Sequence, residues 1–372
     1  MKKTFLYFCL LFIVQTAFAA DSLYVREQQI PILIDRIDNV LYEMRIPAQK
    51  GDVLNEITIQ IGDNVNLSDI QAIRLFYSGV EAPSRKGEHF SPVTYISSHI
   101  PGNTRKALES YSVRQDEVTA PLSRTVKLTS KQPMLKGINY FWVSIQMKPE
   151  TSLLAKVATT MPNAQINNKP INITWKGKVD ERHVGIGVRQ AGDDGSAAFR
   201  IPGLVTTNNG TLLGVYDIRY NSSVDLQEKI DIGVSRSTDK GQTWEPMRVA
   251  MTFKQTDGLP HGQNGVGDPS ILVDEKTNTI WVVAAWTHGM GNERAWWNSM
   301  PGMTPDETAQ LMLVKSEDDG KTWSEPINIT SQVKDPSWYF LLQGPGRGIT
   351  MQDGLPDPVY RRYPCAQRRH YV

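Results

Sequence analysis

Cysteine is nearly absent from this chain of 372 residues, which contains only Cys9 and Cys365. Cys9 lies in an apolar amino-terminal stretch, so a chain that loses this stretch keeps one cysteine and has no internal disulfide. Histidine is also scarce, with six residues, and the sequence has neither an HExxH motif nor a cluster of histidine and cysteine. Packing must therefore stabilise the fold, and the sequence indicates no metal site.

The charges show no excess of either sign, because 40 basic and 39 acidic residues are interspersed and give a net charge of +1. A nucleic-acid surface needs a clustered basic face, so the composition argues against nucleic acid as a partner. The hydrophobic content of 40% allows a large core, and the length favours two domains over one.

The apolar run at the amino terminus, residues 5–14, is too short to cross a bilayer comfortably. Two lysines precede it, and residues 17–19 supply the small side chains that a signal peptidase reads. We interpret residues 1–19 as a signal peptide, with an uncleaved membrane anchor as the alternative. The mature protein is then exported to the periplasm, the cell surface or the medium, without stable insertion into a membrane.

Residues 20–178 alternate apolar and polar side chains in several runs, at 57–61, 73–77 and 140–147, separated by turns rich in Gly, Pro, Asn and Ser. Period-two runs of this length predict an antiparallel β-sandwich with one face of each sheet buried. This half contains no acid pair, metal-ligand spacing or nucleophile motif. The domain is therefore interpreted either as carbohydrate-binding or as a structural brace for its neighbour.

The stretch 199–225 combines two arginines and a carboxylate with a strand–turn–strand pattern around the turn 208–210. A tight hairpin returns Arg200 and Arg219 to the same end of a sheet, and the loop that follows brings Asp225 with them. Guanidinium groups in this arrangement suit an anion. The pattern predicts an anion-binding site with an acid beside it.

The pattern Ser-x-Asp-x-Gly-x-Thr-Trp occurs twice after an apolar strand, at 237–244 and 316–323. Its chemistry is structural: Ser and Asp hydrogen-bond the backbone of a tight turn, Gly supplies a positive φ, and Trp packs the hairpin against its sheet. Strand–turn–strand patterns precede both copies, and a third begins at Gly348. Such repeats predict blades around a common axis, so residues 179–354 are expected to form the first part of a β-propeller.

The repeated turn resembles the Asp-box of sialidase-type propellers. With Phe-Arg-Ile-Pro at 199–202 and Asp-x-Arg at 217–219, the sequence is similar to bacterial exo-α-sialidases (neuraminidases), retaining glycoside hydrolases that remove terminal sialic acid. The amino-terminal half is similar to the accessory domain of gut-bacterial members. The resemblance implies an all-β fold, a sandwich followed by a six-bladed propeller, and sialylated glycoproteins, glycolipids or oligosaccharides as partners.

The resemblance also assigns site residues. Arg200 matches the first of three arginines that clamp the sialic acid carboxylate, which a planar guanidinium can bind bidentately. Arg219 matches a pocket arginine near the C4 substituent, and Asp268 a pocket aspartate that helps to bind the C4 hydroxyl. Asp225 matches the acid/base aspartate on a mobile loop. The family uses a tyrosine nucleophile, since the substrate would repel an anionic one, and it needs no metal or organic cofactor.

Other candidates have simpler interpretations. His261 and His288 are expected to be rim or packing residues. Trp296 and Trp297, on an inserted loop, either stack on a neighbouring sugar or pack the loop onto the propeller. For the whole chain, a catalytically silent sialoglycan-binding protein is the alternative to an exo-sialidase, and the arginine and acid motifs argue against a propeller used only for protein interaction.

The last part of the chain departs from the family, because six blades need about twice the residues found after Gly185. Where the earlier repeats return with an apolar strand, residues 355–372 begin Leu-Pro-Asp-Pro and end in an arginine-rich tail. Two prolines cannot continue a central strand, so we interpret the tail as out of frame and the propeller as incomplete. The nucleophilic tyrosine, its glutamate partner and the other clamp arginines are then missing, and no turnover is expected from this chain.

Overall fold

The computed structural model describes residues 22–27, 30–80, 112–176, 181–291 and 294–349. The interpreted signal peptide and the tail 355–372 lie outside these residues. The chain forms two compact units, and the described residues of the second are 33–36, 185–291 and 294–349. Almost all regular structure is β, which confirms the predicted all-β class. No helix in the described part is long and apolar enough to span a membrane.

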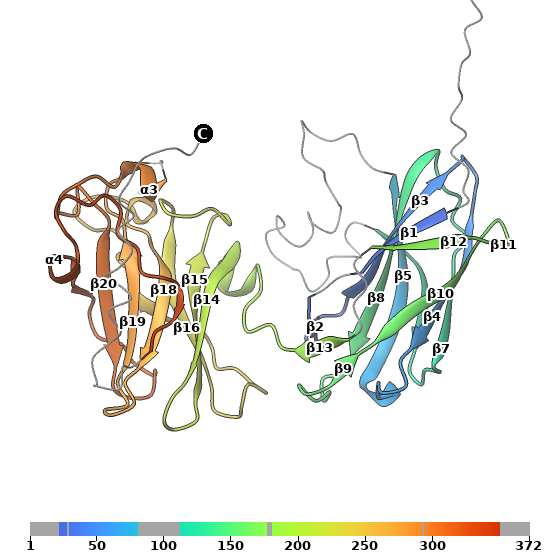
Figure 1. The fold of residues 1–372 in the computed structure, drawn as a ribbon, viewed down its shortest axis with the longest axis horizontal. Coiled ribbons are helices and arrows are strands. Elements are labelled where there is room, and N and C mark those ends of the chain that lie inside the picture. The colour runs from blue at the N-terminus through green and yellow to red at the C-terminus, as the bar shows by residue number, and fades with distance from the viewer. Residues whose placement is uncertain (1–21, 28–29, 81–111, 177–180, 292–293, 350–372) are drawn as a thin grey trace, which may run out of the picture. The chain divides into compact units, whose positions relative to one another are not determined.

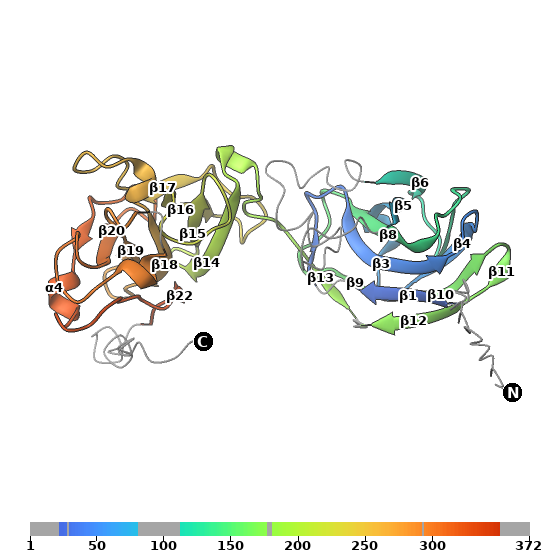
Figure 2. The same ribbon diagram turned by 90° about the horizontal axis from the view of Figure 1, so that it is seen from above.

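The first unit contains two main sheets, whose strands are antiparallel except where β1 and β12 pair. The order of the six-stranded sheet can be followed in Figure 2, and it is β12 (Asn172–Lys176), β1 (Ser22–Glu27), β3 (Asn39–Ala48), β8 (Gly137–Met147), β5 (Ile70–Val80) and β6 (Val113–Thr119). The four-stranded sheet has the order β11 (Lys169–Pro170), β10 (Thr159–Ile166), β4 (Leu54–Ile61) and β7 (Thr125–Thr129).

The three alternating runs of the sequence lie in β4, β5 and β8, as predicted. The expectation that only one face of each sheet is buried is wrong for β5 and β8, where residues on both faces are buried. Polar side chains on the second face are paired: Arg74 contacts Asp38 and Glu117, and Ser144 donates to Asp38. Hydrogen bonds and ion pairs offset the free-energy cost of burying polar groups, so both faces of these strands can be buried.

Short elements complete this part of the chain. A three-stranded sheet has the order β2 (Ile32–Leu33), β13 (Arg182–Gly185) and β9 (Lys156–Val157). A 3-10 helix, η1 (Leu67–Asp69), follows Asn66, whose side chain accepts a hydrogen bond from the Ser68 amide.

The second unit contains two antiparallel meanders of four strands each, seen side by side in Figure 1. The first is β14 (Ala198–Thr206), β15 (Leu212–Arg219), β16 (Ile230–Ser237) and β17 (Arg248–Met251). The second is β18 (Val266–Val273), β19 (Ile280–Trp286), β20 (Gln310–Ser316) and β21 (Ile327–Asn328), with β22 (Gly346–Arg347) parallel to β18. The helical turns are η3 (Asp193–Gly195), η4 (His261–Gln263), α3 (Ala295–Asn298) and α4 (Thr330–Val333).

These two sheets, called blade 1 and blade 2 below, share one apolar core, because β18 packs against β14, β15 and β16. Strands β14 and β22 approach closely: a Cβ atom at Gly203 of β14 would lie 2.3 Å from the carbonyl oxygen of Gly346 in β22. Only glycine fits at such a contact. The meanders are therefore blades of a propeller, as predicted from the repeats.

Both copies of the repeated turn have the predicted hydrogen bonds. In the first, Ser237 Oγ donates to Asp239, the Gly241 amide donates to Ser237 Oγ at 2.8 Å, and the Thr243 amide donates to Asp239. The second copy repeats these bonds around Asp318. Hydrogen bonds from Thr243 lower the pKa of Asp239 to about 2. These aspartates therefore stabilise turns, as the sequence predicts.

The second turn also ties blade 2 to blade 1. Asp319 Oδ2 accepts hydrogen bonds from Thr211 at 2.5 Å and from Arg236 Nη2 at 3.0 Å, and both partners belong to blade 1. The Arg236 side chain is almost completely buried and also pairs with Glu245. Because the same box position in the first turn is the exposed Lys240, this connection is not part of the repeat.

Candidate active site

The inner strands of both blades contain the same irregularity near one end. The register shifts between Arg200 and Gly203 in β14 and between Gly267 and Ser270 in β18. In each case the residue before a proline has a positive φ, 54° at Ile201 and 59° at Asp268. The two bulges therefore occupy equivalent positions in the two blades. A bulge changes the direction in which the neighbouring side chains point.

The hairpin of blade 1 has the predicted geometry. Its register pairs Ala198 with Arg219 and Arg200 with Asp217, so both arginines lie at the end opposite the turn. The turn closes through a hydrogen bond of 2.9 Å from the Thr207 amide to the Thr211 carbonyl.

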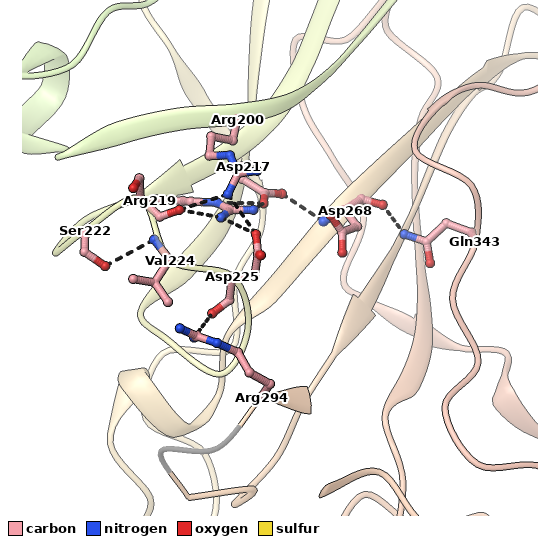
Figure 3. Close-up of polar contacts among 10 residues, drawn as sticks. Arg200, Asp217, Arg219, Ser222, Val224, Asp225, Asp268, Arg294 and Gln343 are labelled. Atoms are coloured by element: carbon pink, nitrogen blue, oxygen red, sulfur yellow. Dashed lines mark hydrogen bonds and ion pairs between the residues drawn. The ribbon is translucent and has the colours of Figure 1, made fainter. Parts of the chain in front are cut away.

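The two arginines meet at the predicted acid (Figure 3). Asp225 Oδ1 accepts a hydrogen bond from Arg200 Nη1 at 2.9 Å and another from Arg219 Nη1 at 2.6 Å. The same two nitrogen atoms donate to the Ser223 carbonyl, each at 2.9 Å. The Arg219 side chain is 1% exposed, whereas those of Arg200 and Asp225 are 43% exposed. In this structure the carboxylate of Asp225 therefore occupies the predicted anion site.

Asp217 was not assigned a role from the sequence, although it is central to this cluster. Its Oδ2 atom accepts from Arg219 Nε at 3.1 Å and Nη2 at 2.7 Å, and its Oδ1 atom accepts from the Asp268 amide at 2.8 Å. Burial raises the pKa of Asp217 to about 7, against the effect of Arg219. Strand alternation indicates that residues 217 and 219 share a face of β15, but it does not by itself assign a role to Asp217.

Asp268, on the bulge of β18, is brought to the same cluster. Burial raises its pKa, while Arg219 acts in the opposite direction. Its carbonyl oxygen accepts a hydrogen bond from the side-chain amide of Gln343, which is 1% exposed. Gln343 lies in an irregular segment 75 residues further along the chain, and no sequence signal indicates its role. The structure thus brings all four predicted site residues together; their assigned roles remain predictions.

The loop that carries Asp225 is held by the inserted segment of blade 2. Arg294 Nη1 donates to the Asp225 carbonyl at 3.1 Å, and the Ala295 amide donates to the Leu226 carbonyl at 3.1 Å. Ala295 packs on this loop, whereas Trp296 and Trp297 are 44% and 61% exposed. These contacts between the segment and the loop come from Arg294 and Ala295.

A polar groove with a volume of about 410 Å³ lies beside the loop that carries Asp225. Its lining comes from this loop, from the turn at 260–263 and from the inserted segment: Val224, Gln227, Glu228, Pro260, Gly262, Gln263 and Arg294. His261, between two lining residues, pairs with Asp231 at 2.8 Å, and His288 is buried with its Nδ1 atom 2.8 Å from Asn264. Both agree with the rim and packing interpretations. Within the described residues, no group of His, Cys, Asp or Glu is arranged to hold a metal ion.

An all-β chain with Asp-box blades and a cluster of arginines and carboxylates at their shared end has the architecture of a BNR-repeat propeller protein. Two family models match it: the N-terminal domain of BNR-repeat neuraminidase over residues 20–170, and the BNR repeat-like domain over residues 201–356. A sialidase of Bacteroides fragilis (strain YCH46) is 59% identical over 360 residues, which are 95% of this chain and 66% of the relative. The chain belongs to the bacterial sialidase family.

The structural comparison agrees with this assignment. The Hadza microbial sialidase Hz136 has a TM-score of 0.77 and 63% sequence identity, covering 89% of this chain and 64% of that one. A sialidase of Paraclostridium sordellii is 36% identical over 161 residues, 42% of this chain. The chain spans less than two thirds of the length of these relatives.

Proposed function

We propose that this chain contains the anion-binding arginines and the proton donor of an exo-α-sialidase. Such an enzyme hydrolyses terminal α-linked sialic acid from glycoproteins, glycolipids or oligosaccharides, with retention of configuration at the anomeric carbon. The observation that carries the proposal is the meeting of two guanidinium groups at one oxygen atom of Asp225. Such a pair of donors suits the carboxylate of sialic acid. The close relatives named sialidase support the reaction class.

In the proposed mechanism the substrate carboxylate replaces Asp225 on Arg200. Arg200 is accessible for this exchange, because 43% of its side chain is exposed. Asp225, once released and protonated, gives its proton to the glycosidic oxygen as the bond to the anomeric carbon breaks and the tyrosine nucleophile of the family, supplied by the later blades, bonds to that carbon. Asp225 later takes a proton from the water that attacks the anomeric carbon and displaces the tyrosine. Arg219 keeps Asp217 as its countercharge during this exchange, and Asp268 faces the same site.

The surroundings of Asp225 also suit a leaving group that is itself a sugar. The polar groove is lined by amide, carboxylate and guanidinium groups, which can hydrogen-bond hydroxyl groups. The exposed rings of Trp296 and Trp297 follow Arg294 and are candidates for stacking on a neighbouring sugar. This interpretation favours stacking over packing for the two tryptophans.

The tail and the incomplete propeller remain part of the proposal: residues 355–372 are out of frame, and the chain alone does not turn over substrate. The test compares this chain with a chimera in which the residues after 349 are replaced by the corresponding remainder of the Bacteroides fragilis sialidase. Release of 4-methylumbelliferone from its sialoside is expected from the chimera only, and Arg200→Ala should abolish that release.

Each outcome of this comparison is informative. Turnover by the unmodified chain at the rate of the chimera would contradict the proposed incompleteness. A folded chimera that binds sialyllactose without cleaving it would favour the alternative, a catalytically silent sialoglycan-binding protein. A folded chimera that neither binds nor cleaves would overturn the proposed function.

A further inference from the structure

We propose that Asp217 is a positioning residue, whose carboxylate fixes Arg219 of blade 1 and Asp268 of blade 2 relative to each other. The inference rests on the proposed function, because it takes Arg219 and Asp268 to be sugar-binding groups. Asp217 itself is 1% exposed and lies behind them, so it acts through its neighbours.

The two carboxylate oxygens of Asp217 accept hydrogen bonds from different residues. Oδ2 accepts two hydrogen bonds from Arg219, through Nε and Nη2, and this fixes the plane of the guanidinium group. Oδ1 accepts the amide of Asp268, a residue whose φ is 59°. A positive φ is unfavourable for a residue with a Cβ atom, and it persists where the surroundings hold it. One carboxylate therefore holds a side chain in one blade and a strained backbone in the other.

Asp225 cannot replace Asp217 in this role. Asp225 contacts only the Nη1 atom of Arg219, and its side chain is 43% exposed on a loop. In the proposed mechanism this contact opens when the substrate binds. The buried guanidinium of Arg219 then needs another countercharge, which Asp217 supplies from the same strand.

The chain offers a matched control in Asp319, at the other end of the same sheets. Asp319 also joins a buried arginine, Arg236, to the second blade. It contacts Thr211 beside the hairpin turn, whereas Asp217 lies near the opposite end of β15. Asp319→Asn therefore weakens a similar contact between the blades without touching the site.

The experiment measures hydrogen exchange by NMR in this chain, at the Asp268 amide and at Arg219 Nε–H, with the Gly241 amide as an internal reference. In Asp217→Ala both protons lose their acceptor, so both should exchange at least tenfold faster relative to the reference. The amide of Asp217→Asn has a single oxygen atom and can serve only one of the two donors. At least one of the two protons should therefore exchange tenfold faster in that variant, and neither should change in Asp319→Asn.

The inference is overturned if both protons exchange at the wild-type rate in a folded Asp217→Ala protein, or in Asp217→Asn should the alanine variant not fold. Acceleration of the Gly241 reference by the same factor would also overturn it, because it would indicate general destabilisation. Titration with N-acetylneuraminic acid provides a separate result. Absence of binding to the folded chimera would count against the proposed function, while the exchange rates in this chain would still decide the role of Asp217.

Discussion

Asp225 has two arginine partners in this structure, and one of them, Arg219, has a second carboxylate partner in Asp217. Burial alone lowers the pKa of Arg219, but Asp217 and Asp225 raise it above its ordinary value. Arg219 therefore stays charged whether Asp225 remains or leaves. Asp225 can change partners because Arg219 keeps its ion pair with Asp217 when Asp225 leaves.

If Asp225 is the proton donor, its removal should matter most where the leaving group needs protonation. In the chimera described above, Asp225→Ala should lower kcat/KM for sialyllactose by about 100-fold or more and affect the activated aryl sialoside much less. Asp319→Asn, which changes an acid that lies away from the site, is the control. Equal losses on both substrates would contradict an acid role for Asp225.

Asp217 should make stability depend on pH in an unusual direction for an aspartate. Its pKa rises from 3.8 to about 7 on burial, so between these values the folded protein binds more protons than the unfolded chain. Stability from this group is present below about pH 4 and is lost as the pH rises to 7, by at most about 4 kcal/mol. Denaturant unfolding from pH 4 to 8 should show this decline in the wild type and a flatter profile in Asp217→Asn.

Sequence patterns predicted the contacts of Arg200 and Arg219 because both lie on a hairpin with a recognisable turn. They did not predict Asp217 as a functional neighbour, since an aspartate two residues from an arginine is common on any strand. The role of Gln343 could not be predicted for another reason. Its partner, Asp268, is distant in sequence, and only tertiary packing brings the two residues together. A contact between residues distant in sequence has no local sequence pattern.

The strands and turns were more predictable than the contacts between them. Alternation and turn residues indicated the hairpin and both Asp-boxes, because these depend on residues close in sequence. The bulges at Ile201 and Asp268 were not predicted, since a proline after an extended residue is compatible with several backbone conformations. Burial of both faces of β5 and β8 also depends on packing that a single strand does not reveal.

The equivalent positions of the two Asp-boxes allow a matched stability test. Lys240 and Asp319 both have a positive φ, 61° and 66°, but only Asp319 reaches across to Arg236. Asp319→Ala should cost about 2 kcal/mol of unfolding free energy, because it leaves a buried arginine short of a partner. Lys240→Ala should change stability by less than about 0.5 kcal/mol. Similar losses in both variants, measured by urea denaturation, would mean that the contact between the blades contributes nothing.

For the whole molecule, the amino-terminal stretch remains a proposal that processing can test. Expression of the full sequence in a Gram-negative host should yield a mature protein that begins at Ala20 and is found outside the cytoplasm. Intact-mass measurement and cell fractionation check both points. Recovery of a membrane-bound protein that retains residues 1–19 would favour the uncleaved anchor.

The cluster at the shared end of the blades has a consequence for the proton balance of binding. The five side chains of the cluster are two guanidinium groups and three carboxylates: Arg200, Arg219, Asp217, Asp225 and Asp268. Together they carry a net charge of −1 when all are ionised. A sialate carboxylate adds one more negative charge, while burial already raises the pKa of Asp217 and of Asp268. The complex should therefore take up a proton as it forms, and calorimetry in buffers of different ionisation enthalpy would count that proton.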